Sequence, residues 1–286
     1  MTIKEAYLHG REHLAASGSM EPALEAEMLL RFVLGVDRAR LYTHWDGGIA
    51  EASWAQYEGL LVERAGGRPV HYIVGEREFM GRSFAVDERV MIPRPETELL
   101  VEVAVVRLRG HDRPVIVDIG TGSGCIAVSL AALVPTALVY ATDFSAGAVA
   151  LAAAAAVRHG VAARITFLQG DLLAALPSAV RGQVDALLSN PPYVPEGRAA
   201  SLPREIRDFE PRQALLAPGD GMGFHRRLVS TAPAWLRPGG MLAMEVGLDQ
   251  APAVLRMLDE ARWWASAGVE RDGAGIGRVV WGVAEK

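Results

Sequence analysis

The sequence predicts an α/β protein in which a mostly parallel sheet, with helices on both faces, follows a small all-helical region. Three observations predict this arrangement. Short apolar runs alternate with helical stretches from residue 115 onward, a pattern typical of parallel sheets. A glycine-rich loop, Gly120-Thr121-Gly122-Ser123-Gly124, follows the first of these runs. The first 70 residues show only the periodicity of amphipathic helices.

Residues 1–70 are expected to form a helical bundle that serves either as a docking or lid module or for packing only. One helix is predicted from Ala23 to Leu34, because Glu21-Pro22 suits a helix start and Gly35 suits a helix end. The side of this helix predicted to be buried carries Leu24, Met28, Leu29, Phe32 and Val33. Further helices are expected near residues 6–15, 39–43 and 50–65.

Residues 71–90 are predicted to form a β-hairpin that links the bundle to a second domain at 91–286. Strand-forming side chains dominate here, and Gly75 and Gly81 punctuate them. These strand formers are Tyr72, Ile73, Val74, Phe79, Phe84, Val86, Val90 and Met91. The segment Ile92-Pro-Arg-Pro-Glu-Thr-Glu98 follows. Its prolines keep the chain extended, and Pro95 suits the first turn of a helix that runs to about Leu108.

The second domain is predicted to contain seven strands, most of them parallel. Each predicted strand is a short apolar run, and helical segments separate the first five. The runs are Val115–Ile119, Leu138–Thr142, Ile165–Gln169, Val184–Ser189, Met241–Val246 and two more after Trp264, the last ending at Val279–Gly282.

Composition limits the classes of function that the chain can have. The 286 residues carry a formal net charge of −5, which argues against a protein whose affinity depends on neutralising many phosphates. A single cysteine, Cys125, excludes an internal disulfide, and we expect it to be a small core residue in a reducing compartment. No spacing of histidines or cysteines predicts a metal site. The sequence shows neither the apolar core of a signal peptide nor a membrane span, so we expect a cytoplasmic protein.

Polar motifs follow three successive predicted strands, at the edge of the sheet where open α/β proteins bind ligands. The glycine loop permits a tight turn and is expected to aim backbone amides at a ligand. Its third glycine comes one residue earlier than in the dinucleotide-binding fingerprint, which disfavours NAD and leaves room for a nucleoside that carries an amino acid. Asp143, about 20 residues further on, is placed to accept from ribose hydroxyls. Asp171 is placed to accept from an adenine amine.

The fourth motif is Asn190-Pro191-Pro192-Tyr193, directly after an apolar strand. Two prolines carry no N–H, so the chain leaves the sheet in a stiff conformation that offers carbonyl acceptors and no donors. The side-chain oxygen of Asn190 and the ring of Tyr193 add an acceptor and a flat face. Such a cluster suits a planar NH₂ group, either an amide or the exocyclic amine of a base.

These motifs together resemble the class I S-adenosylmethionine-dependent methyltransferases and, more narrowly, the HemK/PrmC family of protein-(glutamine-N5) methyltransferases. The resemblance covers roughly residues 70 to 250, and the proline-rich segment at 92–98 is its most discriminating part. The matching segments are Tyr72-Ile73-x-Gly75, Glu78-Phe79-x-Gly81, Ile92–Glu98, Asp118–Cys125, Asn190–Tyr193, Phe209-Glu210-Pro211 and Glu245-Val246-Gly247.

The resemblance implies a Rossmann-like class I methyltransferase fold that uses S-adenosylmethionine and leaves S-adenosylhomocysteine. It implies methylation of the glutamine in the Gly-Gly-Gln motif of class one peptide chain release factors, with the helical bundle as a docking domain for this substrate. Gly120, Thr121, Gly122, Ser123 and Gly124 would hold the methionine part of the cofactor, Asp143 the ribose, and Asp171 or Leu172 the adenine. Asn190, Pro191, Pro192 and Tyr193 would bind the substrate glutamine as the catalytic group, and Asn190 would also reach the cofactor.

The residues predict how such a transfer would work. A carboxamide nitrogen is a poor nucleophile, so the side-chain oxygen of Asn190 and the Pro191 carbonyl are expected to hold its two N–H groups in line with the methyl group. Tyr193 is expected to stack on the amide plane, and no general base is evident. Asp118 is expected either to orient the glycine loop or to bind the cofactor's amino group through water. Phe79 is expected either in the pocket or packed within the hairpin.

Several other functions stay open from the sequence alone. Glutamine methylation of a ribosomal protein needs the same chemistry with different docking. Adenine-N6 methylation of DNA or RNA would use the same four-residue motif, but this acidic chain offers no basic groove for it, and we expect no direct nucleic-acid partner. An NAD-linked oxidoreductase and a non-enzymatic binding module are the alternatives from other classes.

Overall fold

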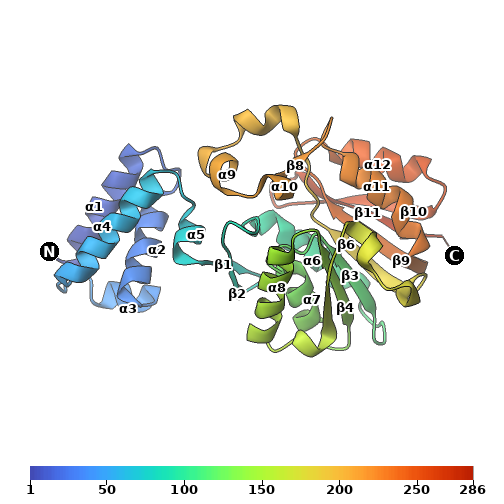
Figure 1. The fold of residues 1–286 in the computed structure, drawn as a ribbon, viewed down its shortest axis with the longest axis horizontal. Coiled ribbons are helices and arrows are strands. Elements are labelled where there is room, and N and C mark those ends of the chain that lie inside the picture. The colour runs from blue at the N-terminus through green and yellow to red at the C-terminus, as the bar shows by residue number, and fades with distance from the viewer. Residues whose placement is uncertain (286) are drawn as a thin grey trace. The chain divides into compact units, whose positions relative to one another are not determined.

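In the computed structural model, which describes residues 1–285, the chain divides into two units (Figure 1). The helical unit comprises Met1–Glu76 together with Pro203–Phe209, and the sheet unit comprises Arg77–Leu202 and the chain from Glu210 onward. The helices of the helical unit are α1 (Ile3–Ala16), α2 (Pro22–Leu34), α3 (Arg38–Thr43), α4 (Glu51–Ala65), α5 (Val70–Val74) and α9 (Arg204–Phe209). The bundle predicted for residues 1–70 is therefore part of a unit that also takes in a segment from far along the chain.

The core of the helical unit is closed by a contact between α1 and α4. The side chain of Tyr57 is fully buried, and its hydroxyl donates to the carbonyl of Ala26 in α2 at 3.1 Å. Gly10 of α1 lies against this ring, and a Cβ added at Gly10 would come within 2.0 Å of the Tyr57 hydroxyl oxygen. The absence of a side chain at Gly10 thus lets the two helices approach each other.

The face of α2 predicted to be buried was correct at Leu29 but wrong at Leu24 and Phe32. Leu24 and Phe32 are 44% and 46% exposed, whereas Ala26, Leu29 and Leu30 are fully buried. The small side chain of Ala26 lies where the Tyr57 hydroxyl reaches the α2 backbone. Gly35 ends α2 with a φ of 61°, as predicted.

The segment between the helical region and the main sheet contains a hairpin that is shorter than predicted. Tyr72, Ile73 and Val74, predicted to be in a strand, lie in α5, which ends at Gly75. Strands β1 (Glu76–Phe79) and β2 (Arg82–Ala85) form the hairpin. Met80 and Gly81 at its tip both have positive φ, as a two-residue turn that matches the strand twist requires. The predicted division at residues 70 and 90 stays a prediction.

The sheet unit is built on seven strands in the order β10-β11-β9-β6-β3-β4-β5. Five neighbouring strands, β9, β6, β3, β4 and β5, are parallel, and β11 is antiparallel to both of its neighbours, β9 and β10. The strands are β3 (Val115–Ile119), β4 (Leu138–Asp143), β5 (Ile165–Gln169), β6 (Val184–Ser189), β9 (Leu236–Glu245), β10 (Trp264–Arg271) and β11 (Gly277–Ala284). A further short pair is formed by β7 (Val194–Pro195) and β8 (Leu216–Ala217).

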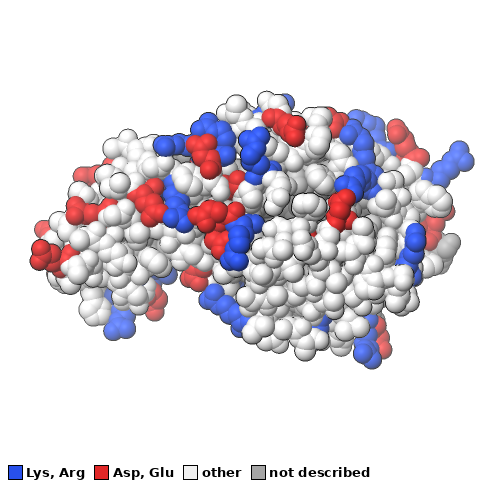
Figure 2. Space-filling view, in the orientation of Figure 1, with Lys and Arg blue, Asp and Glu red and all other residues white. Residues whose placement is uncertain are grey.

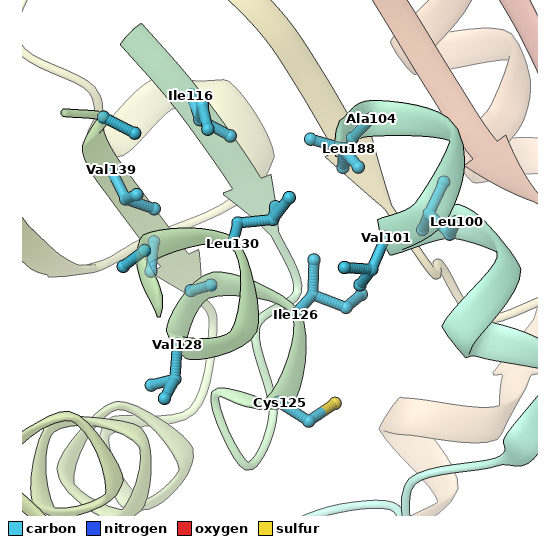
Figure 3. Close-up of a cluster of buried hydrophobic side chains, with 14 of the residues drawn as sticks. Leu100, Val101, Ala104, Ile116, Cys125, Ile126, Val128, Leu130, Val139 and Leu188 are labelled. Carbon is cyan, nitrogen blue, oxygen red and sulfur yellow. The ribbon is translucent and has the colours of Figure 1, made fainter. Parts of the chain in front are cut away.

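Hydrophobic side chains pack on both faces of this sheet, because successive strand residues point in opposite directions. One face, with Ile116 and Leu188, packs against α6, α7 and α8. Figure 3 shows side chains of α6 and α7, among them Val101 and Ile126, directed toward one another beside the strands. The other face, with Val117 and Leu187, packs against α11 and α12. The helices of this unit are α6 (Glu98–Arg107), α7 (Cys125–Leu133), α8 (Ala146–Arg158), α10 (Arg212–Leu215), α11 (Gly223–Thr231) and α12 (Ala251–Glu260).

The surface of the molecule carries charges of both signs, and Figure 2 shows few charged side chains over α7 and α8. This follows from the composition of α8, which is mainly alanine. None of the helices within residues 1–285 combines the length and the apolar composition that crossing a membrane requires. Within the same residues, no group of three or more His, Cys, Asp or Glu side chains is arranged to hold a metal ion.

Candidate functional site

A cavity of about 400 Å³ lies in the sheet unit at the carboxyl ends of β3, β4, β5 and β6. This is the edge at which the sequence predicts a ligand site, and the volume suits a small molecule. Most of the predicted residues line it: Gly120, Thr121, Gly122, Ser123, Asp143, Asp171, Leu172, Asn190 and Pro192. Gly124, Pro191 and Tyr193 are the predicted site residues that do not appear in the described lining.

The backbone amides of Gly120, Thr121, Gly122 and Gly124 donate within the protein, whereas the loop was expected to aim amides at a ligand. The amides of Gly120 and Thr121 donate to the carbonyl of Thr142, at 2.8 and 3.0 Å. The amide of Gly122 donates to Oδ2 of Asp143 at 2.9 Å, and that of Gly124 donates to the Thr121 carbonyl at 2.8 Å. The loop is therefore a preformed wall, held in place by the end of β4.

Asp118 anchors this loop from inside the protein. Its side chain is fully buried, and Oδ2 accepts from the Thr121 hydroxyl at 2.7 Å and from the Ala127 amide at 3.2 Å. Burial raises the pKa of Asp118 to about 7. Of the two predicted roles, the loop-orienting one is the role that these hydrogen bonds describe. Cys125 is also buried, and burial raises the pKa of its thiol to about 12, so the thiol stays neutral as a core residue.

The carboxylate of Asp143 is fixed at the wall of the cavity by two backbone amides. Oδ2 accepts from the Gly122 amide and Oδ1 accepts from the Ser145 amide, both at 2.9 Å. Each oxygen keeps further lone-pair capacity, because a carboxylate can accept about four hydrogen bonds. Two adjacent hydroxyl groups of a ligand are the partners that this geometry suits.

Asp171 forms an ion pair that the sequence did not predict. Arg227 of α11 donates to Oδ2 of Asp171 at 2.6 Å, and both side chains are about half exposed. Leu172 follows with a φ of 50°, which is unusual for a branched residue, and its carbonyl accepts from the Thr142 hydroxyl at 3.1 Å. This part of the cavity thus combines a charged pair with an apolar wall.

The motif Asn190–Tyr193 is fixed at both of its ends. Nδ2 of Asn190 donates to Oγ1 of Thr97 at 3.1 Å. The hydroxyl of Tyr193 faces Oε1 of Glu245 at 3.4 Å, and the Tyr193 carbonyl accepts from Gln250 at 3.0 Å. Burial raises the pKa of Tyr193 well above its usual value. Stacking of the Tyr193 ring on a substrate amide stays a prediction.

Sequence reasoning assigned no role to three side chains that line the cavity: Thr97, Phe144 and Arg227. Phe144 follows Asp143 directly and is 71% exposed, an unusual state for an aromatic side chain. Thr97 belongs to the recognised proline-rich segment 92–98, but no local sequence pattern indicated that it would contact Asn190. Phe79 is 1% exposed and packs edge to face on Phe84. Of the two positions predicted for Phe79, this is the one within the hairpin.

Two protein-family models match this chain. Residues 5–75 match the PrmC N-terminal domain family, and residues 95–206 match the methyltransferase small domain family. The chain is 46% identical over 244 residues to the release factor glutamine methyltransferase of Chlorobaculum tepidum, covering 83% of each chain. It is 41% identical over 281 residues to that of Geobacter sulfurreducens, covering 98% of this chain and 96% of the relative.

Solved structures share the fold at low sequence identity. The catalytic domain of human hMettl16 matches with a TM-score of 0.58 at 18% identity, covering 79% of this chain and 84% of that one. A methyltransferase from Pyrococcus furiosus matches with a TM-score of 0.51 at 15% identity, covering 73% of this chain and 91% of that one. The predicted class I methyltransferase fold is confirmed by these likenesses.

Proposed function

Because the chain belongs to the release factor glutamine methyltransferase family, we propose that it transfers a methyl group from S-adenosylmethionine to the N5 amide nitrogen of a glutamine in its protein substrate. That glutamine is the one in the Gly-Gly-Gln motif of class one peptide chain release factors, so the reaction would modulate translation termination in the cytoplasm. The observation that carries this proposal is the position of Asn190, on the wall of the same cavity as the glycine loop.

The cavity residues fit S-adenosylmethionine. The two carboxylate oxygens of Asp143 keep capacity for the ribose hydroxyls, and the exposed ring of Phe144 offers a stacking surface for the base. Leu172 and Asp171 would line the adenine site, and residues 120–124 would hold the methionine part. When bound, the cofactor supplies a methyl group on a sulfonium, which is already a good electrophile.

The protein's main task is to orient the substrate nitrogen. The Oδ1 atom of Asn190 and the carbonyl of Pro191 would each accept one N–H of the glutamine amide, which aligns the nitrogen without deprotonating it. Positive charge grows on that nitrogen as the bond forms, so the same acceptors bind the transition state more tightly than the ground state. The methyl group leaves the sulfonium as the latter becomes a thioether, and the methylated nitrogen then loses one proton to water. Because an N-protonated amide is strongly acidic, this proton loss needs no general base among these residues.

Replacing Asn190 tests the function and its mechanism together. Asn190→Ala should lower kcat on the order of 10²-fold or more, the scale expected for one preorganised polar contact. S-adenosylmethionine binding, followed by calorimetry, should change little, because Asp143 and the glycine loop remain. Turnover within a fewfold of the unchanged enzyme would mean that Asn190 does not hold the nucleophile.

The substrate class is tested with labelled cofactor. Purified release factor, ribosomal protein and DNA are incubated in parallel with the enzyme and tritiated S-adenosylmethionine. We expect label in the release factor, on the glutamine of its Gly-Gly-Gln motif. Label in the ribosomal protein alone, or in DNA alone, would replace the proposed substrate. Docking of the release factor on the helical unit stays a prediction.

A further inference from the structure

The side-chain amide of Asn190 has two ends, and the proposed function requires one of them to face the substrate. An outward Oδ1 accepts the N–H of the glutamine, whereas an outward NH₂ would oppose it donor to donor. The two ends are nearly equal in shape, so packing alone distinguishes them poorly. Some hydrogen-bonding partner must therefore decide which end points into the cavity.

The partner of Asn190 is a buried hydroxyl that is itself committed to a carboxylate. Oγ1 of Thr97 lies 2.6 Å from Oε2 of Glu245 and 3.1 Å from Nδ2 of Asn190. Thr97 and Glu245 are each 2% exposed, so water does not compete at either group. A hydroxyl has one hydrogen to donate, and an ionised carboxylate can only accept. While Glu245 is ionised, the Thr97 hydrogen must go to Glu245, and the Thr97 oxygen must then accept from Asn190.

We propose that Thr97 and Glu245 are positioning residues that turn the Asn190 amide so that its oxygen faces the substrate nitrogen. This inference rests on the proposed function and concerns how that site is kept in its active arrangement. Within residues 1–285 no hydrogen bond to Oδ1 of Asn190 is formed, so this atom keeps its acceptor capacity. The direction of each bond follows from the chemistry of the groups, whichever way the amide atoms are assigned.

The fold brings these three residues together from distant parts of the chain. β6 and β9 are parallel neighbours in which Ser189 pairs with Met244, so Asn190 and Glu245 come next at the same edge. Thr97 reaches this edge because the proline-rich segment before α6 ends in a 3₁₀ turn at Pro95–Thr97. The sequence 92–98 therefore has a task at the reacting centre, in addition to starting a helix.

The state of Glu245 sets the direction of the whole chain of hydrogen bonds. Burial raises the pKa of Glu245 to about 7, and its carboxyl interacts with the charged or titratable groups of Glu96, Arg278, Tyr193 and Cys125. His225 of α11 meets only its backbone carbonyl, at 2.8 Å. A protonated Glu245 can donate to Thr97, which frees the Thr97 hydrogen for Oδ1 of Asn190 and turns the amide the wrong way.

The first test uses kinetics with a matched pair of variants. Thr97→Val keeps the shape but removes the hydroxyl, and it should lower kcat roughly tenfold to a hundredfold, the effect of misplacing a reacting group. The KM for the release factor and the Kd for S-adenosylmethionine should stay within about threefold, because the other contacts of the protein substrate and of the cofactor remain. Thr97→Ser keeps the hydroxyl and should retain most of the turnover. Because protonation of Glu245 turns the Asn190 amide the wrong way, turnover of the unsubstituted enzyme should fall below pH 7. Glu245→Gln no longer fixes the direction of the hydrogen bonds through Thr97, so this fall should be absent.

The second test observes Asn190 directly, because it is the only asparagine in the chain. Asparagine labelled with ¹⁵N at the side chain gives a single NH₂ signal in an NMR spectrum. We expect this signal to shift as pH passes through about 7, and the shift to vanish in Thr97→Val and Glu245→Gln. This readout does not need turnover, so it still applies if a variant is inactive, and Thr97→Ser gives a folded reference if Thr97→Val is unstable.

The possible outcomes separate the two proposals. If the unsubstituted enzyme transfers no label to the release factor, the proposed function is overturned. If the unchanged enzyme is active and Asn190→Ala is not, turnover of Thr97→Val within a fewfold of normal would overturn the positioning role. An Asn190 NMR signal that changes neither with pH nor with the Thr97→Val substitution would also overturn the positioning role. Loss in Thr97→Val, recovery in Thr97→Ser and a coupled NMR signal would establish it.

Discussion

Phe144 is the side chain at the site whose local state is hardest to explain without a ligand. It is 71% exposed although it directly follows the strand that ends at Asp143, and it lines the cavity. A large apolar ring exposed to water gains free energy when a flat partner covers it, by about 1 kcal/mol for an aromatic contact. Its position beside a carboxylate that suits ribose makes an adenine ring the partner expected here.

Replacing Phe144 should weaken cofactor binding without harming the fold. We expect Phe144→Ala to raise the Kd for S-adenosylmethionine roughly fivefold to tenfold, since about 1.4 kcal/mol corresponds to tenfold. The melting temperature should barely move, because the ring packs little in the free protein. Isothermal titration calorimetry measures the affinity, and Trp263→Ala is the matched control, since Trp263 is 62% exposed and lies outside the described lining. Equal affinities in both variants would contradict a stacking role.

Residues at the site were predictable from the sequence where a local motif marks them. Asp143 and Asn190 follow apolar strands, and the rule that ligands bind at the carboxyl ends of parallel strands placed them correctly around one cavity. Arg227 and Thr97 act through partners 56 and 93 positions away in the chain, respectively. Such pairs depend on how separate elements meet, which a single sequence does not encode in any local pattern.

Among the elements, the loop from β3 to α7 depends on a close approach to α8. Gly124 has a φ of 82°, and a Cβ added there would lie 2.9 Å from the Cβ of Ala152 and 3.0 Å from its Cα. Real Cβ atoms essentially never come within 2.9 Å of another atom, so an alanine here would displace Ala152 or the loop. Gly124 therefore serves the packing of α8 against the loop, in addition to allowing the turn.

Gly124→Ala should destabilise the sheet unit by about 2 to 4 kcal/mol, from a left-handed backbone and an overpacked contact together. Gly160→Ala is the matched control. Its φ is 70°, but a Cβ there meets nothing within 4 Å, so only the backbone contribution of about 1 to 2 kcal/mol should appear. Urea unfolding of both variants measures the difference. Equal losses of stability would show that the contact with Ala152 relaxes freely.

The boundaries of β3 to β6 were predicted within one residue, more accurately than those around the hairpin, whereas β9 begins at Leu236 and not at the predicted Met241. The parallel strands are short, apolar and bounded by polar turns, so their pattern has one reading. Tyr72 to Val74 also looked like a strand, because aromatic and β-branched residues favour one. They form α5 instead, which Gly75 ends in a left-handed conformation. Their local propensity for a strand is overridden by the tertiary context. The same limit explains the misjudged face of α2.

At the scale of the whole molecule, the helical unit takes in a segment that the sequence places in the second domain. Pro203–Phe209 belongs to this unit, although the residues on both sides belong to the sheet unit. A buried guanidinium holds it there. Arg64 of α4 donates to Oε1 of Glu25 in α2 and to Oε2 of Glu205 in α9, both at 2.7 Å. The Arg64 side chain is 9% exposed, the Glu25 side chain 10% and the Glu205 side chain 40%.

Removing Arg64 should therefore loosen two parts of the chain that are far apart in sequence. Arg64→Met leaves the Glu25 carboxylate buried without its partner, which should cost about 3 kcal/mol or more. Glu205→Gln keeps the Arg64–Glu25 pair and removes only a half-exposed charge, so it should cost less than about 1 kcal/mol. Hydrogen exchange followed by mass spectrometry should then show faster exchange in residues 1–76 and 203–209 of Arg64→Met, with β3 to β6 still protected. If residues 203–209 exchange as slowly as before, Arg64 does not hold them in the helical unit, and the stability of that unit is independent of the loop that follows Asn190–Tyr193.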